Sequence, residues 1–266
     1  MSSSYAFGHS PTAAARLVAL ADAFEEPSHS FLVAALQVHD RPIGLAVDLG
    51  CGPGRTTRTL VQVARPVAAA GLDVSEAFLD QARTLELPDT TWHRHDVTEV
   101  PFPLGPADLL YGRYLLAHLR TPASVLEAWL TQLHPGGLLL LEEDEWIATS
   151  NPILASYLDL VVALVAHRGG ELYLGTALKG PVGLGGHRPV FDRLYQHPVP
   201  VPVAARLFSM NFATWRHDPF VTERRSPGFL DRLAAGLAAL AGSDDSASVT
   251  FALRQVAYRR SESVAV

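Results

Sequence analysis

Three alternating glycines constrain this chain more than any other feature of its sequence. Gly50, Gly52 and Gly54 follow the apolar segment Leu45–Val47 and precede a segment of helical character. Glycine accepts a positive φ and lets a ligand approach the main chain closely. The N–H groups at the start of a helix favour a negative or polar ligand group. The stretch therefore predicts a strand, a turn and a helix, with a cofactor bound at the turn.

The spacing of these glycines distinguishes between cofactors. A dinucleotide-binding turn has the pattern G-x-G-x-x-G, and its third glycine would fall at Arg55. Here Asp48 stands two residues before Gly50, in the pattern D-x-G-x-G-x-G. This pattern resembles the first motif of class I S-adenosylmethionine (SAM)-dependent methyltransferases. SAM has no pyrophosphate, and its amino acid end needs an acceptor for the ammonium group and donors for the carboxylate, which Asp48 and the turn can supply.

Composition narrows the class of protein. Hydrophobic residues make up 48% of the 266 residues and charged residues only 18%, which argues against disorder. The net charge of −6 gives no general basic field for nucleic acid. Cys51 is the single cysteine, so no intrachain disulfide forms, and we expect it to be a small wall residue of the turn. With no signal peptide pattern at the N-terminus and only short apolar runs, we expect a cytoplasmic monomer or homodimer without a nucleic-acid or membrane partner.

The order of the expected elements indicates an α/β protein. Strands alternate with helices as far as residue 142, which implies parallel pairing through right-handed crossovers. The later part adds an apolar helix, a glycine-rich segment, two helices and two alternating strands. Expected strands cover residues 45–48, 67–73, 91–96, 107–111, 138–142, 193–203 and 249–259, and expected helices cover 12–24, a segment from Ser28, 55–64, 75–85, 124–133, 153–166, 204–215 and 228–241.

We expect one domain with four parts. Residues 1–44 form N-terminal helices that close over the site, and residues 45–145 form the cofactor-binding core. A glycine-punctuated, apolar segment at residues 146–190 has the place and length of an inserted cap. Residues 191–266 supply the C-terminal part of the sheet and its helices.

Acidic residues end four of the expected strands: Asp48, Asp73, Asp96 and Glu142. Ligands of open α/β sheets bind beyond the carboxyl ends of the strands. Asp73 follows Asp48 by 25 residues, near the spacing at which an acid reaches the hydroxyls of a ribose. Asp96 can accept a hydrogen bond from an exocyclic amine. For each acid alone the alternative is a solvated loop residue or a helix cap.

The resemblance to class I SAM methyltransferases extends over roughly residues 45–142. It runs from the glycine turn through GLDVS, HDV, ADLLYGRYLLAHL and LHPGGLLLLEE. It implies a Rossmann-like, doubly wound, seven-stranded sheet of order 3-2-1-4-5-7-6, whose last strand is antiparallel. It also implies SAM as the cofactor and S-adenosylhomocysteine (SAH) as its product.

The resemblance assigns roles to the residues of these motifs. Gly50 and Gly52 would lie behind the methionine part, Asp73 would hold the ribose, and Asp96 with the Val97 amide would bind the adenine edge. Val74 and Val97 would flank the adenine ring. The N-terminal helices would close over the cofactor. The predicted cofactor contacts are Asp48, Gly50, Cys51, Gly52, Asp73, Val74, Asp96, Val97, Arg113, Tyr5 and Arg16.

Two residues are candidate general bases. The SAM methyl group is already activated, so positioning supplies most of the catalysis and a base adds to it. His118 follows the fourth strand and titrates near neutral pH, although the family often uses a histidine in this L-x-H-L context structurally. Glu142 ends the fifth strand, and alternation would place Asp144 on its side and the two neighbouring glutamates on the other. These four acids could equally be a solvated strand exit. The sequence shows no metal-ligand cluster, so we expect a metal-free reaction.

We therefore expect methyl transfer to an oxygen or carbon atom of a small, largely apolar metabolite of natural-product biosynthesis. An alternative is a SAM-fold protein with a non-methylating role, such as cyclisation or structural cofactor binding. Methylation of nitrogen, RNA or protein is disfavoured by the acidic balance and by the lack of an N-P-P-Y-like motif after the fourth strand. A dinucleotide oxidoreductase is opposed by Arg55.

Overall fold

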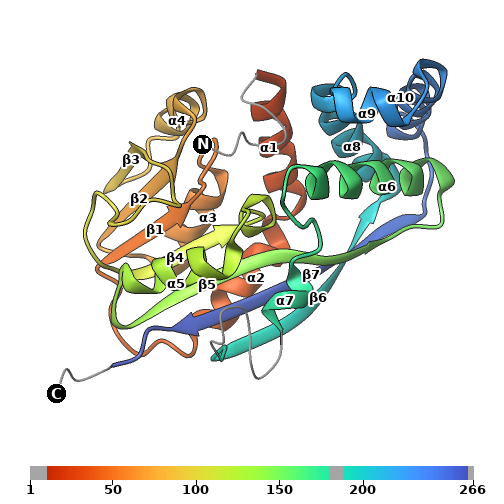
Figure 1. The fold of residues 1–266 in the computed structure, drawn as a ribbon. Helices are drawn as coiled ribbons and strands as arrows, with labels where there is room; N and C mark the ends of the chain where they lie inside the picture. Colours follow the sequence, from red (N-terminus) through yellow and green to blue (C-terminus); the bar gives the residue numbers. More distant parts are fainter. Residues whose placement is uncertain (1–10, 180–187, 263–266) are drawn as a thin grey trace.

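A mixed seven-stranded sheet forms the centre of the molecule (Figure 1). The computed structural model describes residues 11–179 and 188–262. The strand order is β3-β2-β1-β4-β5-β7-β6, with β7 antiparallel to both of its neighbours, as predicted. The other neighbouring strands pair in parallel. The strands are β1 (Leu45–Leu49), β2 (Ala68–Asp73), β3 (Thr90–Arg94), β4 (Ala107–Arg113), β5 (Leu133–Ala148), β6 (Phe191–Pro200) and β7 (Ser248–Arg259).

Helices cover both faces of this sheet and its carboxyl end. Helices α2 and α3 pack on one face, with α4 beside α3, and α5 and α7 pack on the other. The remaining helices lie beyond the carboxyl end of the parallel strands (Figure 1). The helices are α1 (Pro11–Ala23), α2 (Glu25–Leu36), α3 (Arg55–Ala64), α4 (Glu76–Arg83), a 3₁₀ turn (Leu116–His118), α5 (Pro122–Thr131), α6 (Pro152–His167), α7 (Gly175–Leu178), α8 (Val201–Trp215), α9 (Pro219–Arg224) and α10 (Pro227–Ala241).

The apolar run at the centre of β5 shows why both faces must be covered. Side chains alternate between the two faces of a strand. Leu138 and Leu140 pack with residues of α2 and α3, whereas Leu139 and Leu141 pack with residues of α5. All four leucines are fully buried. A continuous apolar run is therefore typical of an inner strand of this sheet.

Strand β5 is much longer than the predicted segment 138–142. The antiparallel strand β7 provides backbone partners along most of it, from Leu138 opposite Arg259 to Ala148 opposite Thr250. The glycines that predict a turn do not interrupt this ladder. Gly136 has a φ of +81° and donates its N–H to the Arg260 carbonyl at 3.0 Å. Long-range pairing with the C-terminal strand thus overrides the local turn signal.

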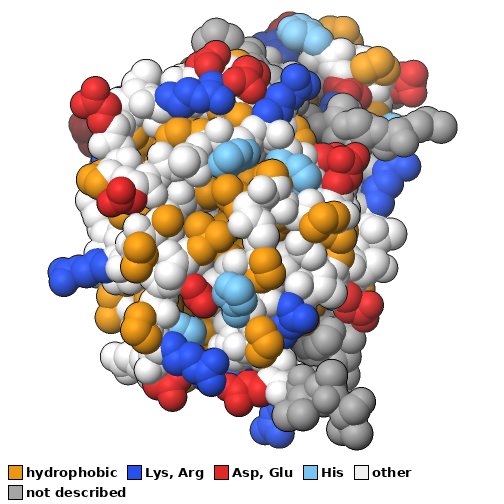
Figure 2. All heavy atoms as spheres, turned by 90° about the vertical axis from the view of Figure 1, so that its left-hand side faces the viewer, with side chains coloured by type: hydrophobic (Ala, Val, Ile, Leu, Met, Phe, Trp, Pro, Cys, Tyr) orange, Lys and Arg blue, Asp and Glu red, His pale blue; other side chains and the backbone are white. Residues whose placement is uncertain are grey.

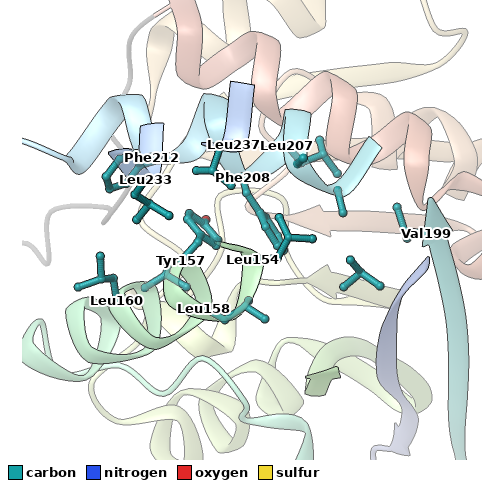
Figure 3. Close-up of a cluster of buried hydrophobic side chains, with 14 of the residues drawn as sticks. Leu154, Tyr157, Leu158, Leu160, Val199, Leu207, Phe208, Phe212, Leu233 and Leu237 are labelled. Carbon is teal, nitrogen blue, oxygen red and sulfur yellow. The ribbon is translucent and has the colours of Figure 1, made fainter. Parts of the chain in front are cut away.

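A second hydrophobic core lies in the helical layer above the sheet (Figure 3). It joins α6, which comes from the expected cap segment, with α8 and α10, which come from the later part of the chain. Tyr157 of α6 stacks on Phe208 of α8, with 4.3 Å between the ring centroids. The Asn211 side chain of α8 also donates to the Tyr157 hydroxyl at 2.6 Å. These contacts fix α6 against α8 and so shape the roof over the sheet.

Helix α2 begins at Glu25 rather than at the predicted cap Ser28. Ser28 is instead buried inside the helix, and its hydroxyl donates to Glu142 Oε1 at 2.6 Å. A buried carboxylate requires a hydrogen-bond donor, and this requirement explains the serine at position 28 better than helix capping does.

The surface mixes both signs of charge. On the face shown in Figure 2, acidic and basic side chains are interspersed, with hydrophobic side chains between them. Among the described residues, no helix has both the length and the apolar character needed to cross a membrane.

Candidate active site

The glycine turn has the backbone conformation that the sequence predicts. Gly50, Gly52 and Gly54 have φ values of +64°, +52° and +80°. The Cys51 N–H, between the first two glycines, donates to the Leu72 carbonyl of β2 at 3.0 Å. The Cys51 side chain is buried, and burial raises the pKa of its thiol well above the usual range. It is thus an inert wall residue of the turn rather than a nucleophile.

Asp73 ties this turn to the end of β2. Its Oδ2 accepts the Gly52 N–H at 2.9 Å, and its Oδ1 accepts the Ser75 N–H at 2.8 Å. Each carboxylate oxygen can accept a further hydrogen bond. Asp73 also lines the cavity described below, so it can hold the turn and accept hydrogen bonds from a ligand at the same time.

Asp48 is held by two threonines of α3. Its Oδ2 accepts the hydroxyls of Thr56 and Thr57, each at 2.6 Å. Burial raises the pKa of Asp48 to about 6, although both threonine hydrogen bonds act to lower it. Sequence reasoning missed these threonines. The signal was the threonine pair in the first turn of the helix that follows the glycines.

A second group of predicted contacts follows β3. Asp96 Oδ1 accepts the N–H and the hydroxyl of Thr98, at 2.9 and 2.7 Å. The Val97 carbonyl accepts the Trp129 indole N–H at 2.7 Å. Val74, which follows β2, is 42% exposed and offers an apolar surface on the cavity wall. Two aliphatic side chains and an acid are therefore available for an adenine ring and its amino group.

One cavity of about 250 Å³ collects most of the predicted site residues. Tyr5 lies outside the described residues. Beyond the turn, the cavity is lined mainly by apolar and aromatic side chains of α1, α6 and α8 and by Phe251 of β7. The predicted residues in its lining are Arg16, Asp48, Gly50, Cys51, Gly52, Asp73, Val74, Asp96, Val97, Arg113 and His118.

Glu142 does not line this cavity, contrary to its predicted place beside the acceptor. Strand alternation turns its side chain toward α2, where it is fully buried and accepts hydrogen bonds from Ser28 and Gln255. Arg113 donates to the same Ser28 hydroxyl at 3.0 Å. Glu142 and Ser28 therefore position the Arg113 guanidinium, which does line the cavity.

His118 lines the cavity from the 3₁₀ turn after β4. Burial lowers its pKa to about 4, and the charges of Arg16 and Arg168 act in the same direction. The imidazole is therefore neutral at pH 7. It can accept a proton, but its low pKa makes it a weak base.

Glu143 and Asp144 line the cavity where Glu142 does not. Glu143 Oε1 accepts the backbone N–H groups of Leu115 and Leu116 at 2.8 and 2.7 Å. Burial nevertheless raises the pKa of Glu143 to about 8. Strand alternation separates Glu143 from Glu142, but the sequence alone does not say which of them meets the cavity.

The residues around the turn fit SAM. Gly50 and Gly52 line the cavity, and a Cβ built on Gly52 would meet only Leu17, at 3.4 Å. Asp48 and Asp73 supply acceptors for an ammonium group and for ribose hydroxyls. Arg113 and Arg16 supply cationic groups in the lining for a carboxylate.

Comparison with known proteins finds a family match over the segment that contains the glycine turn and the strand-end acids. Residues 46–137 match the family described as "Methyltransferase domain". The trans-aconitate 2-methyltransferase of Methylobacterium nodulans is 40% identical over 96 residues, which are 36% of this chain and 36% of that protein. An uncharacterised 37.1 kDa protein of transposon TN4556 from Streptomyces fradiae is 30% identical over 168 residues, which are 62% of this chain and 47% of that protein. The chain thus spans less than half the length of these two relatives.

Solved structures share the fold. A candidate methyltransferase from Bacillus halodurans C-125 is 14% identical, with a TM-score of 0.54 and coverage of 87% of this chain and 99% of that chain. The cyclopropane synthase MmaA2 of Mycobacterium tuberculosis is 16% identical, with a TM-score of 0.50 and coverage of 86% and 83%. Together with the family match and the strand order, these likenesses confirm the resemblance drawn from the glycine turn and the strand-end acids.

The packing around the glycine turn leads to a stability prediction for Gly54→Ala. A Cβ at Gly54 would lie 2.7 Å from the Trp92 ring, whereas a Cβ at Gly105, whose φ is +78°, would meet nothing within 4 Å. Both alanine variants incur a backbone penalty of about 1–2 kcal/mol. Gly54→Ala should lose about 1–3 kcal/mol more through overpacking. Urea unfolding of both variants measures the difference, and equal losses would contradict a close-packed turn.

Glu143 should make the stability of the protein fall as pH rises. Its pKa is about 8 in the folded protein and 4.5 in the unfolded chain, so between these two pH values only the folded state keeps the proton. The contribution of Glu143 to the free energy of unfolding is therefore fully present below pH 4.5. It is lost as the pH rises toward 8, by at most about 1.4 kcal/mol per pH unit. Urea unfolding at several pH values between 6.5 and 8 gives the free energy of unfolding as a function of pH. This free energy should fall less steeply with pH for Glu143→Gln than for the parent protein. Glu127→Gln, at an exposed position of α5, is the control and should keep the parent slope.

Proposed function

We infer that this chain, a class I SAM-dependent methyltransferase, transfers a methyl group from SAM to an oxygen or carbon atom of a small, largely apolar metabolite. One observation carries the proposal. The cavity that holds the glycine turn and the strand-end acids continues without interruption into a lining of apolar and aromatic side chains. Such a lining with a few polar groups is typical of small-molecule sites. We include a cytoplasmic location and a role in natural-product biosynthesis in this proposal.

The residues around the turn would hold the cofactor. Asp73 would accept hydrogen bonds from the ribose, and Asp96 with Val97 would bind the adenine edge between Val74 and Val97. Asp48 and the open glycine backbone would hold the amino acid end, with Arg113 or Arg16 at its carboxylate. When bound, SAM supplies an activated methyl group on a sulfonium.

The helical layer would hold the acceptor. Tyr157 and Leu158 of α6 and Leu207 and Phe208 of α8 line the cavity and exclude water from it. Alignment of the acceptor atom supplies most of the rate enhancement expected of such a site. The relatives named for trans-aconitate act on a tricarboxylate, whereas Glu143 and Asp144 line the cavity here. We therefore do not extend that acceptor to this chain.

His118 is the group in the lining that can take a proton from the acceptor, because its pKa is lowered to about 4 and its imidazole is neutral over the physiological pH range. Glu143, whose pKa is raised to about 8, carries a proton at neutral pH in the free protein and is not available there as a base. Glu142 is buried against α2 and Gln255 and takes no part in this step.

Removal of the Asp73 charge should weaken cofactor binding. Asp73→Asn keeps one acceptor oxygen for the turn but loses the anionic acceptor for the ribose, so SAH should bind at least about tenfold more weakly. Titration calorimetry with SAH measures this loss, and Asp80→Asn, at an exposed position of α4, is the matched control. A parent protein that binds neither SAM nor SAH would overturn the proposed function. An unchanged affinity of Asp73→Asn would overturn only the role of this residue.

His118 should affect methyl transfer more than cofactor binding. Transfer is measured with methyl-labelled SAM and a panel of small phenols, alcohols and acidic carbon compounds, followed by extraction of the labelled product. His118→Asn should lower the transfer rate by about 100-fold if the imidazole acts as the base, with SAH affinity within about twofold of the parent value. Unaltered transfer would assign His118 a structural role, and no label in any acceptor would argue for a non-methylating protein.

A further inference from the structure

Three side-chain oxygens in the cavity have no hydrogen-bond partner among the described residues. They are Tyr114 Oη, Glu143 Oε2 and Asp144 Oδ1. All three residues line the cavity, at the ends of β4 and within β5. Glu143 is fully buried and Asp144 is 8% exposed. Buried polar atoms without partners are uncommon and costly, by about 1–3 kcal/mol each, so they require an explanation.

The two acids that flank this pair in β5 have hydrogen-bond or ion-pair partners within the protein. Glu142 accepts hydrogen bonds from Ser28 and Gln255. Glu145 forms ion pairs with Arg254 at 2.6 Å and with Lys179 at 3.2 Å. Within the described ranges 11–179 and 188–262, no ion pair is formed by Glu143 or Asp144. The two middle acids of the run are therefore neither solvated nor neutralised, and they are the two that meet the cavity.

The surroundings of this pair disfavour the ionised state of its carboxyl groups. Burial raises the pKa of Asp144 well above the usual range, and the charges of Glu143 and Glu142 raise it further, while Arg113 lowers it. The pKa values of Tyr114 and Tyr173 are raised by burial and then by Asp144. Arg113 already donates to Ser28 and lies 5.5 Å from the centre of the Tyr114 ring. Arg16 and His118 line the same cavity.

We propose that Glu143 and Asp144 bind a protonated amine of the methyl acceptor, so that the acceptor is an apolar molecule with a basic nitrogen. This inference rests on the proposed function. An ammonium group has three N–H donors, and Glu143 Oε2, Asp144 Oδ1 and Tyr114 Oη offer three unpartnered acceptors. A cation relieves the repulsion between the two carboxylates. An anionic acceptor would add to that repulsion.

The same geometry separates recognition from methyl transfer. The lone pair of a protonated amine is used in an N–H bond, so the bound nitrogen cannot attack a methyl group. The amine therefore anchors the acceptor while another atom of the same molecule, an oxygen or carbon, is methylated. Binding of the ammonium ion stabilises both carboxylates in the ionised state, and protons that they carried in the free protein pass to the solvent.

Titration calorimetry of the SAH-saturated protein tests this proposal with matched probes. Tyramine and tryptamine are compared with the carboxylic acids and alcohols that have the same ring and chain length. We expect the amines to bind at least about tenfold more tightly than the acids. Titrations at pH 7 in phosphate and in MOPS, whose ionisation enthalpies differ and neither of which contains a primary amine, should show proton release with the amines alone.

Substitutions test whether the amines bind at Glu143 and Asp144. Asp144→Asn and Glu143→Gln should each weaken amine binding at least about tenfold and reduce proton release, while their SAH affinity shows that they are folded. Asp159→Asn, at an exposed position of α6, is the matched control and should keep the amine affinity. Acids or alcohols that bind as tightly as the amines, no uptake of either amine, or unchanged amine affinity in both variants would overturn the proposal. Failure of the parent protein to bind SAH would instead overturn the proposed function.

Discussion

The hydrogen bond between the Gly52 N–H and Asp73 Oδ2 is the contact on which the site depends. It joins the turn after β1 to the tip of β2, and the adjacent bond from the Ser75 N–H fixes the start of α4 to the same carboxylate. The positive φ of each glycine lets the turn bend back far enough to reach Asp73. The acid predicted to bind the ribose therefore also builds the turn that receives the rest of the cofactor.

Burial gives adjacent acids of one strand different tasks. The leucines of β5 place the strand in the centre of the sheet, and the four acids that follow them lie in three different surroundings. Glu142 is satisfied by α2 and β7, and Glu145 by two cations. Glu143 and Asp144 open onto the cavity. A run of acids that looks uniform in sequence is thus divided into positioning, ion-paired and cavity-facing groups by packing alone.

The sequence predicted those features that depend on residues near one another along the chain. The helix after the glycine turn has the predicted bounds, Arg55–Ala64, and the strand order follows from the resemblance in the first half of the chain. Three features depend on distant partners and could not be read locally. Gly136 predicted a turn but continues a strand because β7 pairs beside it. Ser28 looked like a helix cap but serves Glu142, more than a hundred residues away. Strand alternation defined two sets of acids, but only the fold shows which set faces the cavity.

The length of β5 limits how this protein can open. The strand starts beneath α5 and runs into the helical roof, and β7 follows it with hydrogen bonds over nearly the same distance. The helical roof and the base of the sheet therefore share one antiparallel pair of strands, whose register shifts once, between Asp144 and Trp146. A hinge between roof and base would have to break hydrogen bonds of this pair. Helix α1 is attached differently, because it packs against the helices α8 and α3 and is not part of the sheet. We therefore expect α1, which lines the cavity, to move more readily than the paired strands when molecules enter or leave.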